Sequence, residues 1–347
     1  MNQTSFLRQT FTETEGSSNA RTCPLINRER AFLLLDATGK HVRKKTMPSN
    51  KTKKDVYQVI TDRMIEQLEK GTIPWRKGWK ALSGKRPQNY TTKKPYRGMN
   101  AILTACQGYS SPYWITAKQA KDRGGQLKEE HKGNYTPIIK WNWVYYDANG
   151  NKVSDRKKAA KTIPFLRFYQ AYNAEQVEGI EWEKIEEVPL NEHEKLDQCQ
   201  EVIDGYPSPP KMEEGGDQPC YVPLMDTVRM PQMGQFDKSE EYYATMFHEL
   251  VHSTGHKSRL GRLEKQKSHK FGSDCYSKEE LVAEMGAAFL SASCQITEET
   301  FENAAGYIQN WLGKLKGDSK LVVMAAAQAQ KAVDHILDYK PEQKEEK

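Results

Sequence analysis

The sequence predicts an α+β fold in two parts: an N-terminal α+β domain with an antiparallel sheet, and a mainly helical C-terminal domain. Aromatic residues alternate with polar ones over residues 138–146 and 163–172, as they do in half-buried strands. Apolar residues recur at helical spacing between residues 238 and 339. The net charge of +6 divides into +4 over residues 1–46, +16 over residues 47–172 and −14 over residues 173–347. This division predicts two parts with different partners.

The length of 347 residues favours two domains, each with its own modest core. Residues 1–50 are polar and aperiodic, which predicts a disordered extension. An N-terminal domain then covers residues 51–173. Its expected elements are a helix over 55–70 capped by Asp55 and followed by Gly71, loop over most of 71–112, a short helix over 116–123 ended by Gly124-Gly125, and two strands that flank an Asn149-Gly150 turn.

The strand over residues 138–146 has two distinct faces. Ile139, Trp141, Trp143 and Tyr145 alternate on one face, with polar residues on the other. Core packing is the favoured interpretation for the two tryptophans.

The second half begins with an acidic, proline-containing connector over residues 174–216, with one helix over 191–203. A mainly helical domain follows over residues 217–340, and residues 341–347 form a charged tail. Its expected elements are a strand over 221–230 and helices near 238–254, 278–293, 301–314 and 318–339.

The most specific motif is HELVH at residues 248–252. Histidines at positions i and i+4 of a helix share one face and can bind one zinc ion. The adjacent glutamate can take a proton from the attacking water. We therefore expect His248 and His252 as metal ligands and Glu249 as the catalytic base.

The residues around the motif support a helix and exclude one metallopeptidase class. Asp237 and Glu240 are spaced as a capping box at the start of the helix, and Gly255 follows its end. A metzincin would need a third histidine six residues after the motif, where this chain has Ser258. His256 is interpreted as a group beside the substrate or behind a ligand, with a solvated loop histidine as the alternative.

A third ligand is expected from the helix over residues 278–292, which contains Glu280 and Glu284. On a helical wheel both glutamates flank the apolar face, whereas Glu279 points to solvent. We expect Glu280 to be the ligand and Glu284 to contact a ligating histidine, with Glu284 as the fallback ligand. The alternative is that Ser277 and Glu280 form a capping box, which would occupy that carboxylate.

The basic N-terminal half contains 17 of the 34 aromatic residues of the chain. Bases of a single strand stack on aromatic side chains while Lys and Arg neutralise its phosphates, so this composition favours single-stranded DNA as a partner. The densest stretches are PWRKGW and PYRGMN. The candidate DNA contacts are Trp75, Arg76, Lys77, Trp79, Tyr96, Arg97, Asn100, Trp114 and Lys118.

Several other classes of protein are disfavoured. No apolar run approaches the ~18 residues of a membrane span, and the N-terminus lacks a secretory signal, so we expect a cytoplasmic protein with no membrane partner. The six cysteines show no CxxC spacing, which fits a reducing compartment. No Walker or dinucleotide-binding glycine pattern is present.

The sequence resembles the ArdC-type antirestriction proteins of conjugative plasmids and related mobile elements from about residue 53 to residue 337. The stretches that carry the resemblance are PWRKGW, KPYRGMN, YSSPYWITAKQAK, YYATMFHELVHSTGHKSRLGR, FGSDCYSKEELVAEMGAAFL and YIQNWLGKLKGDSK. It implies an N-terminal domain that binds single-stranded DNA and a C-terminal zincin-like domain. It also implies that His248, His252 and a glutamate of EELVAE hold the metal, with Glu249 as base.

The leading hypothesis is an antirestriction protein that binds single-stranded DNA and carries a zinc-dependent peptidase of the gluzincin type. One Zn²⁺ ion is expected, or another divalent transition metal, and a host protein is a possible substrate. Two alternatives stay open. The chain could be a DNA-protecting module whose metal site is structural or inactive, or a regulatory metalloprotease that cleaves one specific protein.

Overall fold

The computed structural model describes residues 55–75, 86–184, 192–265, 274–296 and 304–340. The predicted N-terminal extension and C-terminal tail lie outside the described residues. Residues 53–347 form one compact unit. Its helices are α1 (Val56–Glu69), α2 (Met99–Ala105), α3 (Ala117–Lys121), α4 (Glu192–Asp204), α5 (Ser239–Ser253), α6 (Asp274–Ser293), α7 (Ala304–Gly317) and α8 (Leu321–Ile336).

The strands form three separate sheets. The largest has the order β1-β2-β6-β4-β5, the second has the order β8-β10-β9, and β3 pairs with β7. The strands are β1 (Gln88–Asn89), β2 (Tyr113–Ile115), β3 (Gln126–Leu127), β4 (Thr136–Tyr146), β5 (Lys152–Val153), β6 (Lys161–Asn173), β7 (Val177–Glu178), β8 (Lys211–Glu214), β9 (Cys220–Val222) and β10 (Thr227–Met230).

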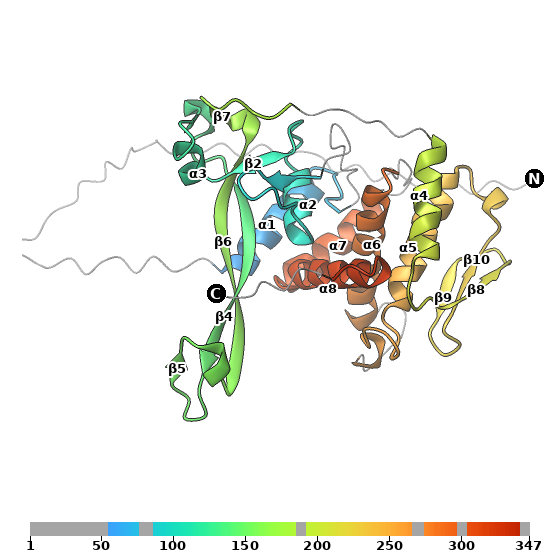
Figure 1. Ribbon diagram of the computed structural model, residues 1–347. Helices are drawn as coiled ribbons and strands as arrows, with labels where there is room; N and C mark the ends of the chain where they lie inside the picture. The colour runs from blue at the N-terminus through green and yellow to red at the C-terminus, as the bar shows by residue number, and fades with distance from the viewer. Residues whose placement is uncertain (1–54, 76–85, 185–191, 266–273, 297–303, 341–347) are drawn as a thin grey trace, which may run out of the picture. The chain divides into compact units, whose positions relative to one another are not determined.

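The predicted antiparallel sheet is present, and β4 and β6 dominate it as a long two-stranded ribbon (Figure 1). The two strands pair without interruption from Thr136 opposite Ala171 to Tyr146 opposite Lys161. Gly150 adopts a positive φ of 81° at the predicted turn. The turn leads first into the short strand β5 and only then, after a 3-10 turn, into β6.

One face of β4 is less buried than predicted. Trp141 packs edge-on against Tyr57 of α1, with ring centroids 6.5 Å apart, so its predicted core position is confirmed. Trp143 lies two residues nearer the tip of the ribbon and is 53% exposed, which corrects its predicted burial. The ribbon extends past the helix that covers its base, so alternation alone could not locate the end of the core.

Helix α1 has the predicted start and end. The Asp55 side chain accepts a hydrogen bond from the Tyr57 backbone N–H, and Gly71 follows with a φ of 78°. The expected loop over 71–112 is wrong where it includes α2. This helix begins after Gly98 and has no side-chain cap, so its start carries no recognisable signal.

The helical half contains the predicted helices, with two local corrections. Helix α5 begins after Lys238 with no side-chain cap, so the expected Asp237–Glu240 capping box is not formed. The single strand expected over 221–230 is a hairpin of β9 and β10, with Asp226 at a φ of 46° in the turn. The left-handed conformation of Asp226 reverses the chain inside what looks like one apolar run.

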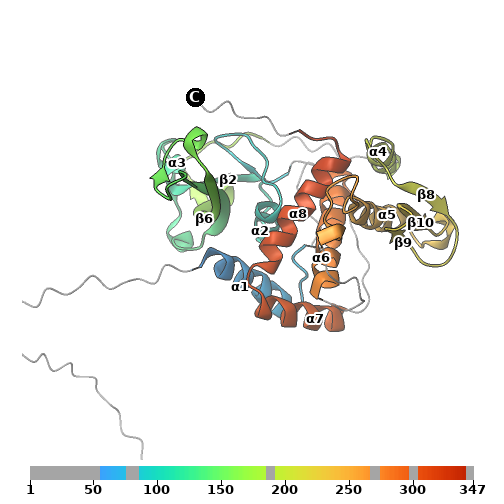
Figure 2. The same ribbon diagram turned by 90° about the horizontal axis from the view of Figure 1, so that it is seen from below.

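One large hydrophobic cluster spans the two halves, and two smaller clusters lie in the N-terminal half and the start of the connector. Apolar side chains of α1 and α2 join those of α5, α6, α7 and α8 in a single buried cluster, and Figure 2 shows α1 beside α7 and α8. The Thr61 hydroxyl on α1 donates to the Ser319 carbonyl just before α8, at 2.7 Å. The start of the expected connector also packs with the N-terminal half, because β7 pairs with β3.

Candidate metal centre

Three predicted ligands come together between α5 and α6. The Nε2 atoms of His248 and His252 are 3.0 Å apart. Glu280 faces both rings: its Oε2 is 3.6 Å from His248 Nε2 and its Oε1 is 3.5 Å from His252 Nε2. Among the described residues, these three side chains form the one group of ligand atoms that all lie within 4.8 Å of one another.

The spacing of these atoms fits a small tetrahedral ion. Zinc–ligand bonds of about 2.0–2.1 Å place tetrahedral ligand atoms about 3.3 Å apart, and the three closest pairs here measure 3.0, 3.5 and 3.6 Å. Two imidazoles and one carboxylate leave a fourth position open, as catalytic zinc sites require. The donor set and its geometry therefore support a divalent metal ion.

Glu249 lies between the two histidines in the sequence and on the same helix. Its side chain is buried with only 7% exposure. Helix α5 thus supplies two candidate ligands and a carboxylate within five consecutive residues.

His252 is held on its other side by a carboxylate that sequence reasoning placed in solvent. Its Nδ1 lies 3.5 Å from Oε1 of Glu279, which is only 5% exposed. Arg262 binds the same carboxylate at 2.6 and 3.2 Å and also donates to the Val251 carbonyl at 2.8 Å. Helix α6 is buried on more than one side. The helical wheel, which assumes a single buried face, therefore wrongly predicted that Glu279 points to solvent.

Neighbouring charges shift the pKa values of His252 and Glu279. Burial lowers the pKa of His252, but the nearby carboxylates, Glu279 first, more than offset it and the net shift is upward. Burial likewise raises the pKa of Glu279, but its contacts with His252 and Arg262 outweigh this and hold the pKa below its usual value. Glu279 therefore stays ionised and orients the His252 ring, as ligand-supporting carboxylates do.

Glu284 has different neighbours from those expected. Its Oε2 accepts hydrogen bonds from the Tyr307 hydroxyl and, at 3.3 Å, from the indole Nε1 of Trp75. Glu279 is the carboxylate that supports His252, so the role predicted for Glu284 is corrected. The capping-box alternative for Glu280 is also excluded, because α6 begins at Asp274 and places Ser277 inside the helix.

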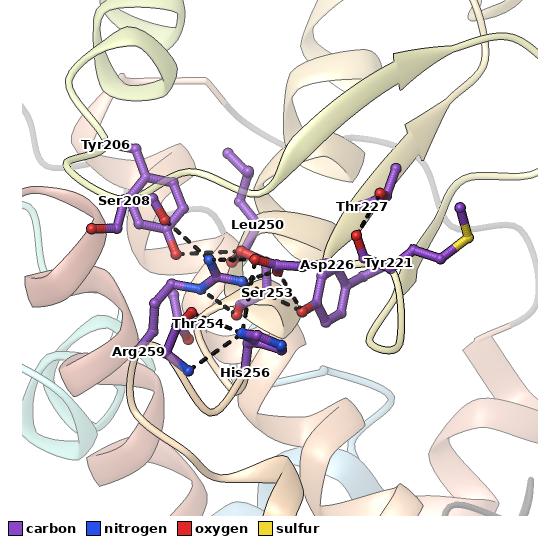
Figure 3. A network of polar contacts seen from close by, with 12 residues as sticks. Tyr206, Ser208, Tyr221, Asp226, Thr227, Leu250, Ser253, Thr254, His256 and Arg259 are labelled. Carbon is purple, nitrogen blue, oxygen red and sulfur yellow. Dashed lines mark hydrogen bonds and ion pairs between the residues drawn. The ribbon is translucent and has the colours of Figure 1, made fainter.

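His256 belongs to a polar network beyond the end of α5 (Figure 3). Its Nδ1 is 3.8 Å from Oδ2 of Asp226 and 2.8 Å from the Ser258 hydroxyl. Arg259 binds both oxygens of Asp226 and donates to the Ser253 carbonyl at 2.7 Å. Burial raises the pKa of Asp226, but Arg259 and Tyr221 more than offset it, and the resulting pKa is low. The network ties the β9–β10 turn to the end of the motif helix.

Most described DNA-contact candidates have structural roles. Trp75, Trp114 and Tyr96 are 0%, 1% and 8% exposed, so they cannot stack on a strand that passes over the surface. Their burial corrects the prediction that they form an open stacking surface, because loop-like composition concealed helix α2 and its packing. Arg76, Lys77 and Trp79 lie outside the described residues.

The remaining candidates differ in their surroundings. Arg97 forms an ion pair with Asp334 of α8 and lies 4.1 Å from the Tyr339 ring. The Asn100 side chain bonds the backbone N–H and carbonyl of Ile139, at 2.8 and 2.9 Å. Both are thus committed within the fold, whereas Lys118 is exposed on α3 and stays a predicted contact.

Comparisons with known proteins agree with both halves. Residues 54–172 match the N-terminal domain of the anti-restriction factor ArdC, and residues 207–328 match the zincin-like metallopeptidase family. A crystal structure of metal-free antirestriction ArdC protein from plasmid R388 superposes with a TM-score of 0.63. It is 32% identical, and the match covers 82% of this chain and 97% of that one. The chain belongs to the ArdC-type antirestriction family.

A second ArdC structure from the same plasmid contains Mn(II). It is 33% identical to this chain, with the same TM-score of 0.63 and the same coverage of 82% and 97%. A divalent ion at the His248, His252 and Glu280 group of this ArdC-type chain is consistent with that structure.

Longer relatives contain a similar region. Two DNA primases named TraC from Escherichia coli are each 34% identical over 85% of this chain. The matches cover 28% and 20% of the two primases, so the ArdC-type chain spans about a quarter and a fifth of their length. A protein of Sinorhizobium fredii, y4eC, is 29% identical over 82% of this chain and 92% of its own.

Within the described ranges, no helix combines the length and apolar character needed to cross a bilayer.

Proposed function

We propose that this ArdC-type protein is a zinc-dependent peptidase that also binds single-stranded DNA, and that it protects DNA of a mobile element from restriction. The single observation that carries the peptidase proposal is the convergence of His248, His252 and Glu280 beside the buried Glu249. Three ligands with an open fourth position are typical of catalytic zinc.

The residues of the chain divide the chemistry between them. A bound Zn²⁺ ion would polarise the scissile carbonyl and acidify a water molecule. Glu249 takes the proton from the attacking water and can return it to the leaving amine. Glu279 and Arg262 keep the His252 ring in one orientation, so the ligand set needs little rearrangement.

The DNA-binding part of the proposal rests on charge. Residues 47–172 have a net charge of +16 and half of the aromatic residues of the chain. A single strand is attracted to such a surface through its phosphates, and its bases stack on aromatic rings.

Glu249→Gln tests the peptidase. We expect metal binding to be retained and cleavage of a casein or peptide-library substrate to fall at least about 100-fold, because general bases typically contribute 10²–10⁴-fold. Zinc content is measured by mass spectrometry on the same samples. Glu240→Gln, on the same helix, is the matched control and should cleave at the wild-type rate.

A restriction-protection assay then separates the two open alternatives. If Glu249→Gln still protects incoming single-stranded DNA, protection is a binding function and the metal centre serves another purpose. If protection is lost while DNA binding is normal, cleavage of a protein is required. An unchanged cleavage rate in Glu249→Gln with zinc bound would rule out the assigned base.

A further inference from the structure

A pocket of about 410 Å³ opens at the base of the β4–β6 ribbon, apart from the metal centre. Its walls combine two lysines, two tyrosines and several hydroxyl and amide groups, as sites that orient a polar aromatic ligand do. The lining residues are Asn89, Thr92, Lys94, Pro95, Tyr96, Thr116, Gln119, Lys140 and Tyr169.

The Tyr96 hydroxyl is the unusual atom of this pocket. It is buried, and it has no partner in hydrogen-bonding geometry among the described residues. A buried polar atom without a partner costs free energy, so such atoms are rare unless a ligand or water satisfies them. Asn89 and Tyr169 are close enough to interact with it, although neither meets the full geometry of a hydrogen bond. The pocket therefore presents a poorly satisfied hydroxyl group beside a second tyrosine.

The pocket continues onto one face of the ribbon. Side chains of directly paired residues point to the same face, and Tyr169 and Lys140 share a face with Arg167, which is paired with Lys140. The same alternation adds Phe165, which lies 5.0 Å from the Arg167 guanidinium, and the exposed Ile163. We call this the outer face, since the opposite face packs on α1 through Trp141.

The charge of the outer face favours a polyanion. None of the side chains that β4 and β6 place on it between Ile138 and Tyr146, or between Lys161 and Tyr169, is acidic. Three further exposed basic residues follow near the tip, in the 3-10 turn Arg156–Lys158. From Tyr169 to Lys161 the strand extends about 27 Å, enough for several nucleotides.

We propose that single-stranded DNA lies along the outer face of β4 and β6 and inserts one base into the pocket beside Tyr96. This proposal rests on the proposed DNA-binding function and assigns it a location. Lys140 and Arg167 neutralise phosphates, Phe165 and Tyr169 provide stacking surfaces, and the Tyr96 hydroxyl bonds the inserted base. The buried tyrosine is thus a base contact within a pocket, in contrast to the open stacking surface first expected.

The charge of the face is tested with the full chain and a fluorescent oligothymidine. Lys140→Glu combined with Arg167→Glu should weaken binding at least about tenfold and make the salt dependence shallower by about 1.4, because two phosphate contacts are lost. The control combines Lys70→Glu with Lys331→Glu, two exposed lysines that follow α1 and lie on α8, and it changes the net charge equally. It should bind like the wild type.

The pocket is tested with Tyr96→Phe, which keeps the ring and removes only the hydroxyl. We expect affinity for oligothymidine to fall about threefold to tenfold, while affinity for an abasic strand of equal length is unchanged. The melting temperature should stay the same or rise, because an unpartnered buried group is removed. Tyr242→Phe, in the helical half, is the control and should change neither affinity.

The outcomes separate this inference from the proposed function. If the wild type binds no single strand, the DNA-binding function itself is wrong. If the wild type binds but the Lys140 and Arg167 variant binds equally well, the strand lies elsewhere and the inference is overturned. If Tyr96→Phe weakens binding of oligothymidine and of the abasic strand equally, the base pocket is overturned. The same holds if it weakens binding of neither.

Discussion

At the scale of single residues, His252 is the side chain that links the candidate metal centre to its supporting carboxylate. One ring nitrogen faces His248 and Glu280, and the other faces Glu279. The Glu279 carboxylate is in turn fixed by Arg262. Carboxylates behind a ligating histidine fix its tautomer and increase its basicity, so this chain of contacts should matter for metal affinity.

Replacing Glu279 with glutamine should raise the dissociation constant for Zn²⁺ about 10- to 100-fold, because the support of His252 is weakened. The measurement is competition with a coloured chelator, alongside a thermal melt of the metal-free protein. Glu284→Gln is the matched control on the same helix and should bind Zn²⁺ like the wild type. If Glu284→Gln weakened Zn²⁺ binding more than Glu279→Gln does, the support of His252 would be wrongly assigned to Glu279.

The sequence predicted the candidate ligands but not the side chains that support them. The i and i+4 spacing of the histidines fixes a shared helix face, so the two histidines could be paired from local geometry alone. Arg262 and Glu279 bond each other although they are 17 residues apart in the sequence. Only the tertiary packing of α6 buries the helix face that carries Glu279. The burial of Trp75 and Trp114 was not predicted for the same reason. Composition does not indicate which side chains of a loop pack against the rest of the fold.

At the scale of elements, the close approach of α5 and α6 brings the ligands together. A Cβ atom at Gly286 of α6 would lie 2.7 and 2.8 Å from the Val251 methyl groups of α5, so a larger residue cannot fit without movement. Val251 lies inside the HELVH motif. Glycine at this position therefore sets the separation between Glu280 and the histidines.

We expect Gly286→Ala to lower the free energy of unfolding by about 1–3 kcal/mol and to weaken metal binding, because the two helices are forced apart. Urea denaturation and metal titration measure the two effects. Adding Val251→Ala should restore much of both by making room. Gly313→Ala on α7, where a Cβ meets no atom within 4 Å, should instead stabilise the protein slightly. If Gly286→Ala binds metal normally, the spacing argument fails.

Helices and strands with a long periodic pattern of apolar residues were predicted correctly. A short helix and a tight turn were not. The helices α1, α5, α6, α7 and α8 and the strands β4 and β6 were all expected from their spacing. Helix α2 has seven residues and no side-chain cap, so neither period nor start signal could reveal it. The β9–β10 hairpin turns at Asp226, and no glycine in that turn announces a positive φ.

At the scale of the whole molecule, the shared core joins the basic N-terminal half to the helical half that holds the candidate metal centre. The Trp75 ring packs edge-on against Trp311 of α7, with centroids 5.9 Å apart, and its indole nitrogen bonds Glu284 of α6. The backbone N–H of Gly98 donates to Gln330 of α8 at 2.8 Å. Length alone favoured a separate core for each half, but these contacts join the halves in one large cluster.

A single cooperative unfolding transition is expected for residues 53–347, with helical signal and tryptophan fluorescence changing together. Trp75→Ala should cost about 3–5 kcal/mol, because the indole is fully buried in the shared core. Trp143→Ala is the control: this ring is 53% exposed and its loss should cost no more than about 0.5 kcal/mol. Two separate transitions would show that the halves fold independently.

The shared core also constrains how such a protein can evolve. Recombination between the two halves of the gene would separate helices that share one hydrophobic cluster. The resulting proteins would expose the apolar side chains of α1 or α8 to water. The two halves should therefore be inherited together, as one cassette. The matches to the longer TraC primases, which span both halves at once, are what this constraint leads us to expect. New domains can be added outside the cassette, but an insertion that separates its halves should be counterselected.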